Sequence, residues 1–327
     1  PMGSGLGGGG YWLLHRRDGA ETFIDGREKA PLSASPSMYL NAKSNASLDG
    51  PLAAAIPGLP AALVHLSQQY GCLPLTISLA PAIRYAQYGF AINSRYLKML
   101  RFRYPVLKTY PSSAAIFLEE GKLPEKYSIL RQQDLANTLK KLATQGHDGF
   151  YRGDVARALV ESVRQNGGIW SLADLENYHI IEQKPVKGSY RGITLTSAPP
   201  SSSGGIVLLE ALNILEKYPL MDTNNSQYKH LVIEALRQAY HDRAMYLGDS
   251  DFVHVPQQRL TSKVYASYLQ KTIAPDKALP SDTLSKPIHD IHQGDNTTHF
   301  SIMDDQGNRV AATLSINFPF GSAFVAE

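Results

Sequence analysis

Cysteine is almost absent from this chain, and its scarcity excludes two kinds of structure. Cys72 is the only cysteine among 327 residues, so neither an internal disulfide nor a cysteine-rich zinc site can form. Its neighbours give no sign of an activated thiol, and we interpret Cys72 as a small hydrophobic residue. The 10 histidines include no H-x-x-x-H or H-E-x-x-H pair, so we expect no metal site.

Long apolar runs and basic runs are also missing. No apolar run approaches the roughly 18 residues that a membrane-spanning helix needs, and no signal peptide is visible. The net charge is only +3, from 32 basic and 29 acidic residues, and the basic residues are scattered, so nucleic-acid binding is not indicated. The 43% apolar and 19% charged fractions are ordinary for a globular protein.

Strand patterns lie at both ends of the chain. Residues 11–14 and 22–24 predict a β-hairpin with its turn at Asp18-Gly19. Residues 298–303 and 310–316 predict a second hairpin, which turns at 304–308. We therefore expect strands that are distant in sequence to meet in one sheet.

Helical periodicity fills the middle of the chain. Helices are predicted within 60–100, around 155–163, after a capping box at Ser171-Asp174, and at 205–217 and 228–246. Alternation predicts a strand at 190–196, and a polar surface loop is expected at 272–295. Together with the terminal hairpins, these elements predict a mixed α+β fold.

The glycine cluster near the start contains a misleading motif. Residues 3–8 satisfy the dinucleotide-binding pattern G-x-G-x-x-G, but strand-like residues follow it where that motif requires a helix. We expect glycine backbone packed closely near a site instead of nucleotide binding. The chain has no G-x-x-x-x-G-K-[ST] and no G-x-S-x-G motif either.

Two polar segments allow both a functional and a structural interpretation. Arg27 could hold a substrate carboxylate through two parallel hydrogen bonds, or it could be an exposed residue paired with Glu28. The run Ser201-Ser202-Ser203-Gly204-Gly205 could be a substrate-facing turn or a plain N-cap for the next helix. From the residues alone, the structural interpretation is favoured in both cases.

The most informative stretch is Asn296-Thr297-Thr298-His299, where a polar loop meets a predicted strand. A threonine freed at a chain N-terminus has an α-amine with a pKa of about 7.7–8, against about 10.4 for lysine. Near neutral pH this amine can accept the hydroxyl proton, so one residue supplies both nucleophile and base. Taken alone, two threonines before a strand indicate only β propensity, and a structural role is expected for His299.

Further motifs follow one another along nearly the whole chain. They are residues 4–10, 25–31, 57–60, 199–205, 242–243, 246–249, 251–253, 297–301, Asn317 and 320–321. This series resembles the gamma-glutamyltranspeptidase family, which belongs to the N-terminal-nucleophile hydrolases. The resemblance implies their αββα sandwich, with residues 1–296 as an incomplete large-subunit portion and 297–327 as the start of the small subunit.

The resemblance also implies a precursor that cuts itself between Asn296 and Thr297 into a large and a small subunit. Thr297 would attack the γ-amide carbonyl of glutathione or a related γ-glutamyl compound. Water, an amino acid or a peptide would then resolve the γ-glutamyl-enzyme ester, so the resemblance implies a gamma-glutamyltransferase and glutathione hydrolase. Arg27 corresponds to the arginine that holds the glutamyl α-carboxylate, Ser315 replaces a threonine that bonds the nucleophile, and Asn317 contacts the substrate.

Turn placement supports this set of residues. Thr297 begins one strand of the last predicted hairpin, while Ser315 and Asn317 end its partner. A turn at 304–308 brings those ends side by side. We expect these residues to converge at one rim of the sheet, without a metal or organic cofactor.

Two alternatives remain open. A cephalosporin acylase-type amidase would keep the fold and the nucleophile but act on another substrate, and Arg27 favours γ-glutamyl compounds instead. A non-catalytic binding relative would have no need of the intact junction at Asn296-Thr297.

The chain is expected to be a fragment. It opens at Pro1 without an initiator methionine and stops at Glu327 after an apolar stretch. In the family, the remainder of the small subunit supplies the amine-binding groups and the oxyanion hole, so we expect the fragment alone to be inactive and to expose sheet edges. Family members are secreted, periplasmic or membrane-anchored, which sets the expected location.

Overall fold

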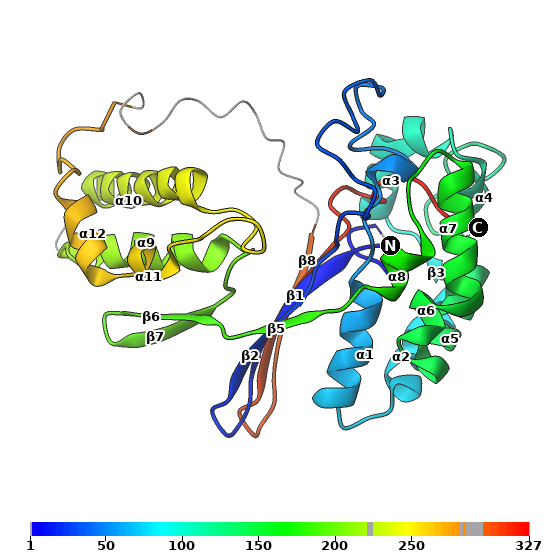
Figure 1. Ribbon diagram of the computed structural model, residues 1–327, viewed down its shortest axis with the longest axis horizontal. Helices are drawn as coiled ribbons and strands as arrows, with labels where there is room; N and C mark the ends of the chain where they lie inside the picture. The colour runs from blue at the N-terminus through cyan, green and yellow to red at the C-terminus, as the bar shows by residue number, and fades with distance from the viewer. Residues whose placement is uncertain (1, 221–224, 281–283, 285–296, 327) are drawn as a thin grey trace.

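The structure is a computed structural model that describes residues 2–220, 225–280, 284 and 297–326 (Figure 1). Its centre is a five-stranded antiparallel sheet in the order β5-β2-β1-β9-β8. The strands are β1 (Gly9–His15), β2 (Glu21–Gly26), β5 (Ile181–Gln183), β8 (Thr297–Met303) and β9 (Arg309–Ser315). Because β1 pairs with both β2 and β9, the two ends of the chain meet in one sheet, as predicted.

Both predicted hairpins are confirmed, and their turn residues explain them. In the first turn Gly19 adopts a φ of 82°, and Asp18 accepts a hydrogen bond from the Ala20 amide at 3.0 Å. In the second turn the Asp304 carboxylate accepts the amides of Gln306 and Asn308, at 3.0 and 2.8 Å. Short acidic side chains that bond the backbone ahead of them favour such turns.

The two faces of the central sheet differ in chemistry. Trp12, Leu14, Ile24 and Ala312 lie on one face and are buried against helix α1 (Leu59–Gln69). The alternate residues point to the opposite face, because side chains alternate along a strand. That face, here called the polar face, carries Tyr11, Asp25, His299, Thr313 and Ser315.

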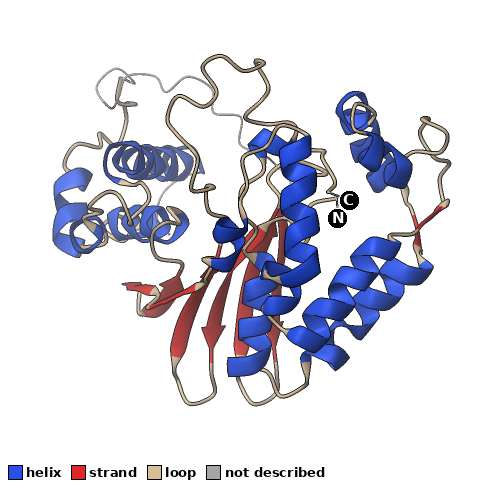
Figure 2. Cartoon of the chain, turned by 45° about the vertical axis from the view of Figure 1, so that its right-hand side comes forward, coloured by secondary structure: helices blue, strands red, loops and turns tan. Residues whose placement is uncertain are grey.

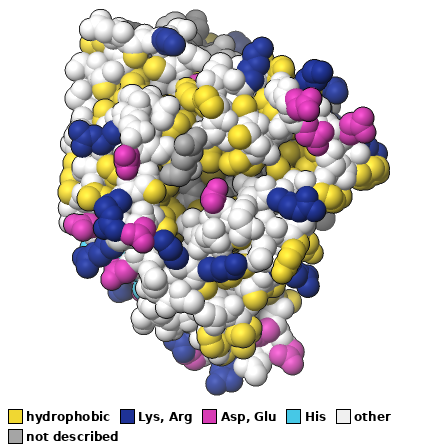
Figure 3. Space-filling view, turned by 90° about the vertical axis from the view of Figure 1, so that its right-hand side faces the viewer, with side chains coloured by type: hydrophobic (Ala, Val, Ile, Leu, Met, Phe, Trp, Pro, Cys, Tyr) yellow, Lys and Arg dark blue, Asp and Glu magenta, His cyan; other side chains and the backbone are white. Residues whose placement is uncertain are grey.

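A layer of helices covers the apolar face (Figure 2). It consists of α1, α2 (Leu75–Tyr88), α5 (Gln133–Gln145), α6 (Asp148–Tyr151), α7 (Gly153–Gln165) and α8 (Leu172–Glu176), with α3 (Ser94–Leu107), α4 (Pro111–Phe117), the 3₁₀ turn η1 (Pro51–Ala53) and the short strands β3 (Phe90–Ala91) and β4 (Ile129–Leu130) beside it. The predicted capping box is present at α8, where Ser171 and Asp174 bond each other's backbone. On the surface shown in Figure 3, basic and acidic side chains are interspersed.

A second layer lies on the side of the polar face (Figure 1). A hairpin of β6 (Val186–Tyr190) and β7 (Ile193–Ser197) packs under α9 (Gly204–Leu215), where a Cβ on Gly188 would lie 2.5 Å from Leu209. Helices α10 (Asn225–Tyr246), α11 (Gln257–Leu260) and α12 (Lys263–Gln270) complete this layer. The order helix, strand, strand, helix agrees with the predicted αββα sandwich.

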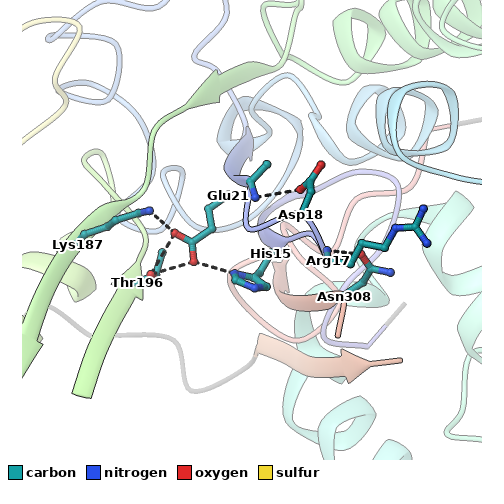
Figure 4. A network of polar contacts seen from close by, with 8 residues as sticks. His15, Arg17, Asp18, Glu21, Lys187, Thr196 and Asn308 are labelled. Atoms are coloured by element: carbon teal, nitrogen blue, oxygen red, sulfur yellow. Dashed lines mark hydrogen bonds and ion pairs between the residues drawn. The ribbon is translucent and has the colours of Figure 1, made fainter. Parts of the chain in front are cut away.

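A carboxylate ties this hairpin to the central sheet (Figure 4). Glu21 of β2 accepts Lys187 Nζ of β6 at 2.5 Å, Thr196 Oγ1 of β7 at 3.2 Å and His15 Nδ1 of β1 at 2.9 Å. The hydrogen bond from Lys187 is the main reason that the pKa of Glu21 is lowered. We call these four residues the Glu21 clamp.

Two sequence predictions were wrong. Residues 190–196 are not one strand, because Arg191 and Gly192 have φ angles of 49° and 83° and form the tight turn between β6 and β7. Cys72 is exposed and does not pack as a hydrophobic residue. Most of the loop expected at 272–295 lies outside the described residues. Within the described ranges, no helix is both long and apolar enough to span a bilayer.

Candidate active site

One rung of the central sheet holds Thr297 and Ser315. Thr297 begins β8, and its Cα partner on β9 is Ser315, the last residue of that strand. Ser315 is also the partner of Gly9 on β1. Directly opposed residues project to the same face, so Thr297 and Ser315 share the polar face. The prediction that the two ends of this hairpin lie side by side is confirmed.

Asn317 is joined to this rung through the backbone. Its amide donates to the Ser315 Oγ at 2.9 Å, and its own side chain is exposed. The φ of Asn317 is 69°, a left-handed conformation that asparagine tolerates better than most residues. A serine hydroxyl can accept one hydrogen bond and donate another, so this contact leaves the Ser315 hydrogen available for a bond to the predicted nucleophile, Thr297.

The glycine cluster lets neighbouring backbones approach the rung. A Cβ on Gly8 would lie 2.1 Å from the Ser315 carbonyl oxygen, and a Cβ on Gly9 would lie 2.9 Å from the Arg27 Cα. No side chain fits at such distances. The expected close packing of glycine backbone is therefore confirmed, and it brings the end of β2 close beside β1 at the level of Ser315.

Arg27 follows β2 at the same end of the sheet as Thr297. Its guanidinium Nη1 donates to the Tyr11 hydroxyl at 3.0 Å, and this hydroxyl also lies 3.0 Å from Ser201 Oγ. The Arg27 side chain is exposed, as the structural interpretation expected, but within the described residues it forms no ion pair with Glu28.

The main chain of Arg27 is anchored separately from its side chain. The amide donates to Asp25 Oδ1 at 2.9 Å, and the carbonyl accepts the Tyr178 hydroxyl at 2.6 Å. Burial raises the pKa of the Asp25 and Glu28 carboxyls. It raises the pKa of the Tyr11 hydroxyl as well, so that hydroxyl keeps its proton throughout the neutral range.

The serine-rich turn faces the site. Ser203 is the N-cap residue of α9 but makes no side-chain capping bond, and its Oγ accepts Arg243 Nε at 3.0 Å instead. Ser201 reaches the polar face through Tyr11. The run thus supplies the N-cap residue of α9, as the favoured interpretation expected, and Ser202 Oγ accepts the Gly204 amide at 3.4 Å. A cavity of about 530 Å³ opens beside the turn and is lined by Gln183, Lys184, Pro199, Pro200, Ser250, Val253, His254, Val255 and Gln257.

Two residues complete the description of the site. His299 Nδ1 lies 2.8 Å from Thr313 Oγ1 across the β8–β9 pair, which fits the structural role expected for it. Asn296, the other half of the predicted junction, lies outside the described residues. No group of three or more potential metal-ligating side chains occurs in the part of the chain that the structure describes.

Sequence reasoning missed Tyr11. A signal was present, because counting back from the turn at Asp18-Gly19 places Tyr11 opposite Asp25, two residues before Arg27. The contact with Ser201 had no such signal, since the residues are 190 positions apart and belong to different layers.

Comparison with known proteins identifies the family of this chain. The sequence profile described as Gamma-glutamyltranspeptidase matches residues 1–327. A glutathione hydrolase proenzyme from Pseudomonas sp. (strain A14) is 41% identical over 334 residues, which cover 100% of this chain and 58% of that protein. The chain thus spans little more than half the length of this curated relative.

Solved structures give the same result for the fold. The gamma-glutamyltranspeptidase of Helicobacter pylori is 38% identical, with a TM-score of 0.83 over 89% of this chain and 85% of that chain. A cephalosporin acylase from Bacillus halodurans is 29% identical, with a TM-score of 0.87 over 99% of this chain and 60% of that chain. The predicted N-terminal-nucleophile hydrolase fold is confirmed, and the chain belongs to the gamma-glutamyltranspeptidase family.

Proposed function

We propose that the protein containing this chain is a self-cleaving threonine enzyme that hydrolyses or transfers the γ-glutamyl group of glutathione and related compounds. The observation that carries the proposal is the rung in which Thr297 faces Ser315, with Arg27 at the same end of the sheet. The glutathione hydrolase name of the Pseudomonas relative supports the same substrate class.

Cleavage between Asn296 and Thr297 is the first step of the proposal. It would leave residues 1–296 in the large subunit and begin the small subunit at Thr297, which keeps its place at the start of β8. Thr297, on the described side of the proposed cut, is exposed. The new α-amine would be the base that the nucleophile needs near neutral pH.

The catalytic cycle then has two halves. The Thr297 Oγ attacks the γ-amide carbon while the α-amine takes the hydroxyl proton, and that proton passes to the leaving amine as the amide bond breaks. The product is a γ-glutamyl ester on Thr297. Water, an amino acid or a peptide then attacks the ester carbon and returns a proton to the Thr297 oxygen. In this proposal Ser315 donates a hydrogen bond to the nucleophile, and Asn317 contacts the substrate.

Arg27 gives the proposal its substrate class. A guanidinium presents several N–H donors in a plane and matches a carboxylate with two parallel bonds. The glutamyl α-carboxylate is the group expected there. The family resemblance further implies that amine-binding groups and an oxyanion hole come from sequence after Glu327, and that the enzyme acts in the periplasm or outside the cell.

The first test uses the full-length precursor. Intact mass and N-terminal sequencing after incubation at neutral pH should reveal a fragment that begins Thr-Thr-His-Phe-Ser. Thr297→Ala should stay uncut and inactive because it lacks the hydroxyl. Thr298→Ala, a matched control on the neighbouring position, should be cut and active. A well-folded wild-type protein that remains a single chain would refute the proposal.

A second candidate function is an amidase of the cephalosporin acylase type, which the Bacillus halodurans structure favours. Two anilides separate the candidates. The γ-glutamyl anilide carries an α-amine and a carboxylate, whereas the glutaryl anilide keeps the carboxylate and lacks the amine. We expect at least about a tenfold preference in kcat/KM for the γ-glutamyl compound, which corresponds to one well-made charged hydrogen bond. The reverse preference would support the acylase.

A further inference from the structure

We infer that Tyr11 is a positioning residue, whose hydroxyl holds the Arg27 guanidinium in the direction that receives the carboxylate of the substrate. The inference rests on the proposed function of the same site. It concerns the hydrogen bond between Tyr11 of β1 and Arg27, which follows β2. It predicts that loss of the Tyr11 hydroxyl weakens the binding only of substrates that carry the carboxylate.

Tyr11 is placed for this task by the sheet. Its Cα partners are Asp25 on β2 and Thr313 on β9, so it projects from the polar face one row beyond the rung of Ser315. Its ring is half-buried and packs against Phe23, with 5.1 Å between the ring centroids. A ring held by strand register and packing gives its hydroxyl a fixed position.

The hydrogen-bond chemistry fixes the roles of the partners. An arginine side chain only donates, so the Tyr11 oxygen accepts from Arg27 Nη1 at 3.0 Å. The phenol hydrogen is then available to Ser201 Oγ, also at 3.0 Å. A guanidinium has five N–H donors, and this contact uses one of them. The others remain for a planar carboxylate.

The main-chain contacts of Arg27 make Tyr11 separable from the rest of the site. The Arg27 amide and carbonyl are held by Asp25 and Tyr178, at 2.9 and 2.6 Å. Loss of the Tyr11 hydroxyl therefore leaves the backbone in place and removes the hydrogen bond that directs the guanidinium. An arginine side chain carries large rotamer entropy, so an undirected Arg27 would have to be ordered by the substrate itself.

A different role for Tyr11 must be distinguished. The hydroxyl also joins the turn at Ser201 to the sheet, so it could serve only to fix that turn. Ser201→Ala breaks the contact with the turn and preserves the contact between Tyr11 and Arg27. The two roles thus predict opposite behaviour for Tyr11→Phe and Ser201→Ala.

The test compares two anilides in the full-length precursor after cleavage. With γ-glutamyl anilide, Tyr11→Phe should raise KM by roughly 3- to 10-fold, which is the effect expected from the loss of one hydrogen bond. It should change kcat less than twofold. With 4-aminobutyryl anilide, which lacks the carboxylate, kcat/KM should not change. Ser201→Ala should alter KM less than twofold.

The matched control is Tyr104→Phe. The Tyr104 hydroxyl donates to the Gly121 carbonyl at 2.8 Å in the helical layer, so this variant loses a comparable bond away from the site. It should leave both substrates unaffected. An equal effect of Tyr11→Phe on both anilides, no effect on either, or its full reproduction by Ser201→Ala would overturn the inference. A wild-type protein that cleaves neither anilide would instead refute the proposed function.

Discussion

At the scale of single residues, Ser315 carries the most specific expectation. The hydroxyl is placed opposite Thr297 and is fixed by the Asn317 amide. Ser315→Ala should lower kcat for γ-glutamyl hydrolysis by roughly 10- to 100-fold, because in the proposed mechanism Ser315 donates a hydrogen bond to the nucleophile. Ser315→Thr keeps the hydroxyl and should retain most of the activity. Equal rates for the alanine and threonine variants would show that the hydroxyl has no part in the reaction.

Asn317 combines a backbone requirement with its proposed role at the substrate. Its φ of 69° disfavours residues with an ordinary Cβ, and the cost for alanine is about 1 kcal/mol. Asn317→Ala should therefore reduce the free energy of unfolding by about that amount, whereas Asn317→Gly should not. Both variants lose the side-chain carboxamide of Asn317 and should lose activity. Denaturant unfolding and kinetics measured on the same samples separate the two effects.

At the scale of elements, the Glu21 clamp determines how firmly the β6–β7 hairpin holds to the central sheet (Figure 4). The pKa of Glu21 is lowered, so its stabilising contribution is present above the unfolded value of 4.5 and is lost as pH falls below it. Glu21→Gln should cost about 1 kcal/mol of unfolding free energy at pH 7, since the pair is partly exposed. The difference from wild type should shrink toward pH 3.

The neighbouring turn offers a control for this prediction. Asp18 forms an exposed ion pair with Arg16 at 3.3 Å, and an asparagine can keep the hydrogen bond that Asp18 accepts from the Ala20 amide. Asp18→Asn should change stability by less than about 0.5 kcal/mol. Equal losses in the two variants would mean that the clamp does no more than an exposed ion pair.

A second element-scale prediction concerns the interface of α9 and α10. Burial, and then the charge of nearby Asp242, raise the pKa of Glu210 from 4.5 to about 9. A raised carboxyl pKa means that the folded state holds a proton that the unfolded state releases above pH 4.5. Stability should therefore fall as pH rises from 4.5 toward 9, by at most about 1.4 kcal/mol per pH unit.

Glu210→Gln removes this titration and should flatten the decline of stability with rising pH. Glu125→Gln, a change at an exposed glutamate, should leave the wild-type profile unchanged. Thermal unfolding between pH 5 and 9 measures both variants. A Glu210→Gln profile as steep as that of wild type would contradict the assignment.

The sequence predicted the elements whose signals are local. Both hairpins have acidic turn residues and clear alternation, and the capping box at α8 needs only four consecutive residues. The β6–β7 turn was missed because Arg191 adopts a left-handed conformation, which an arginine in the sequence does not indicate. At the site, Thr297, Ser315 and Arg27 could be predicted from the series of motifs along the chain. Tyr11 could be found only from the pairing register between β1 and β2.

At the scale of the whole molecule, β8 is an edge strand whose seven residues are all exposed. Phe300, Ile302 and Met303 are 38, 59 and 70% exposed. The expected exposure of a sheet edge is thus confirmed. Exposed apolar edges pair with other chains, so the 327-residue chain alone should self-associate in sedimentation experiments and should show no γ-glutamyl hydrolysis. Activity of the isolated chain would contradict this prediction.

The position of β9 has a consequence for any cut made before Thr297. β9 lies between β8 and β1, and it pairs with β1 from Gly9↔Ser315 to His15↔Arg309. Ser113 Oγ also donates to the Ala323 carbonyl at 2.8 Å. The two polypeptides produced by the cut would therefore separate in denaturing electrophoresis and elute as one complex in size-exclusion chromatography without denaturant. Such a cut would create a new N-terminus and leave its surroundings assembled around it.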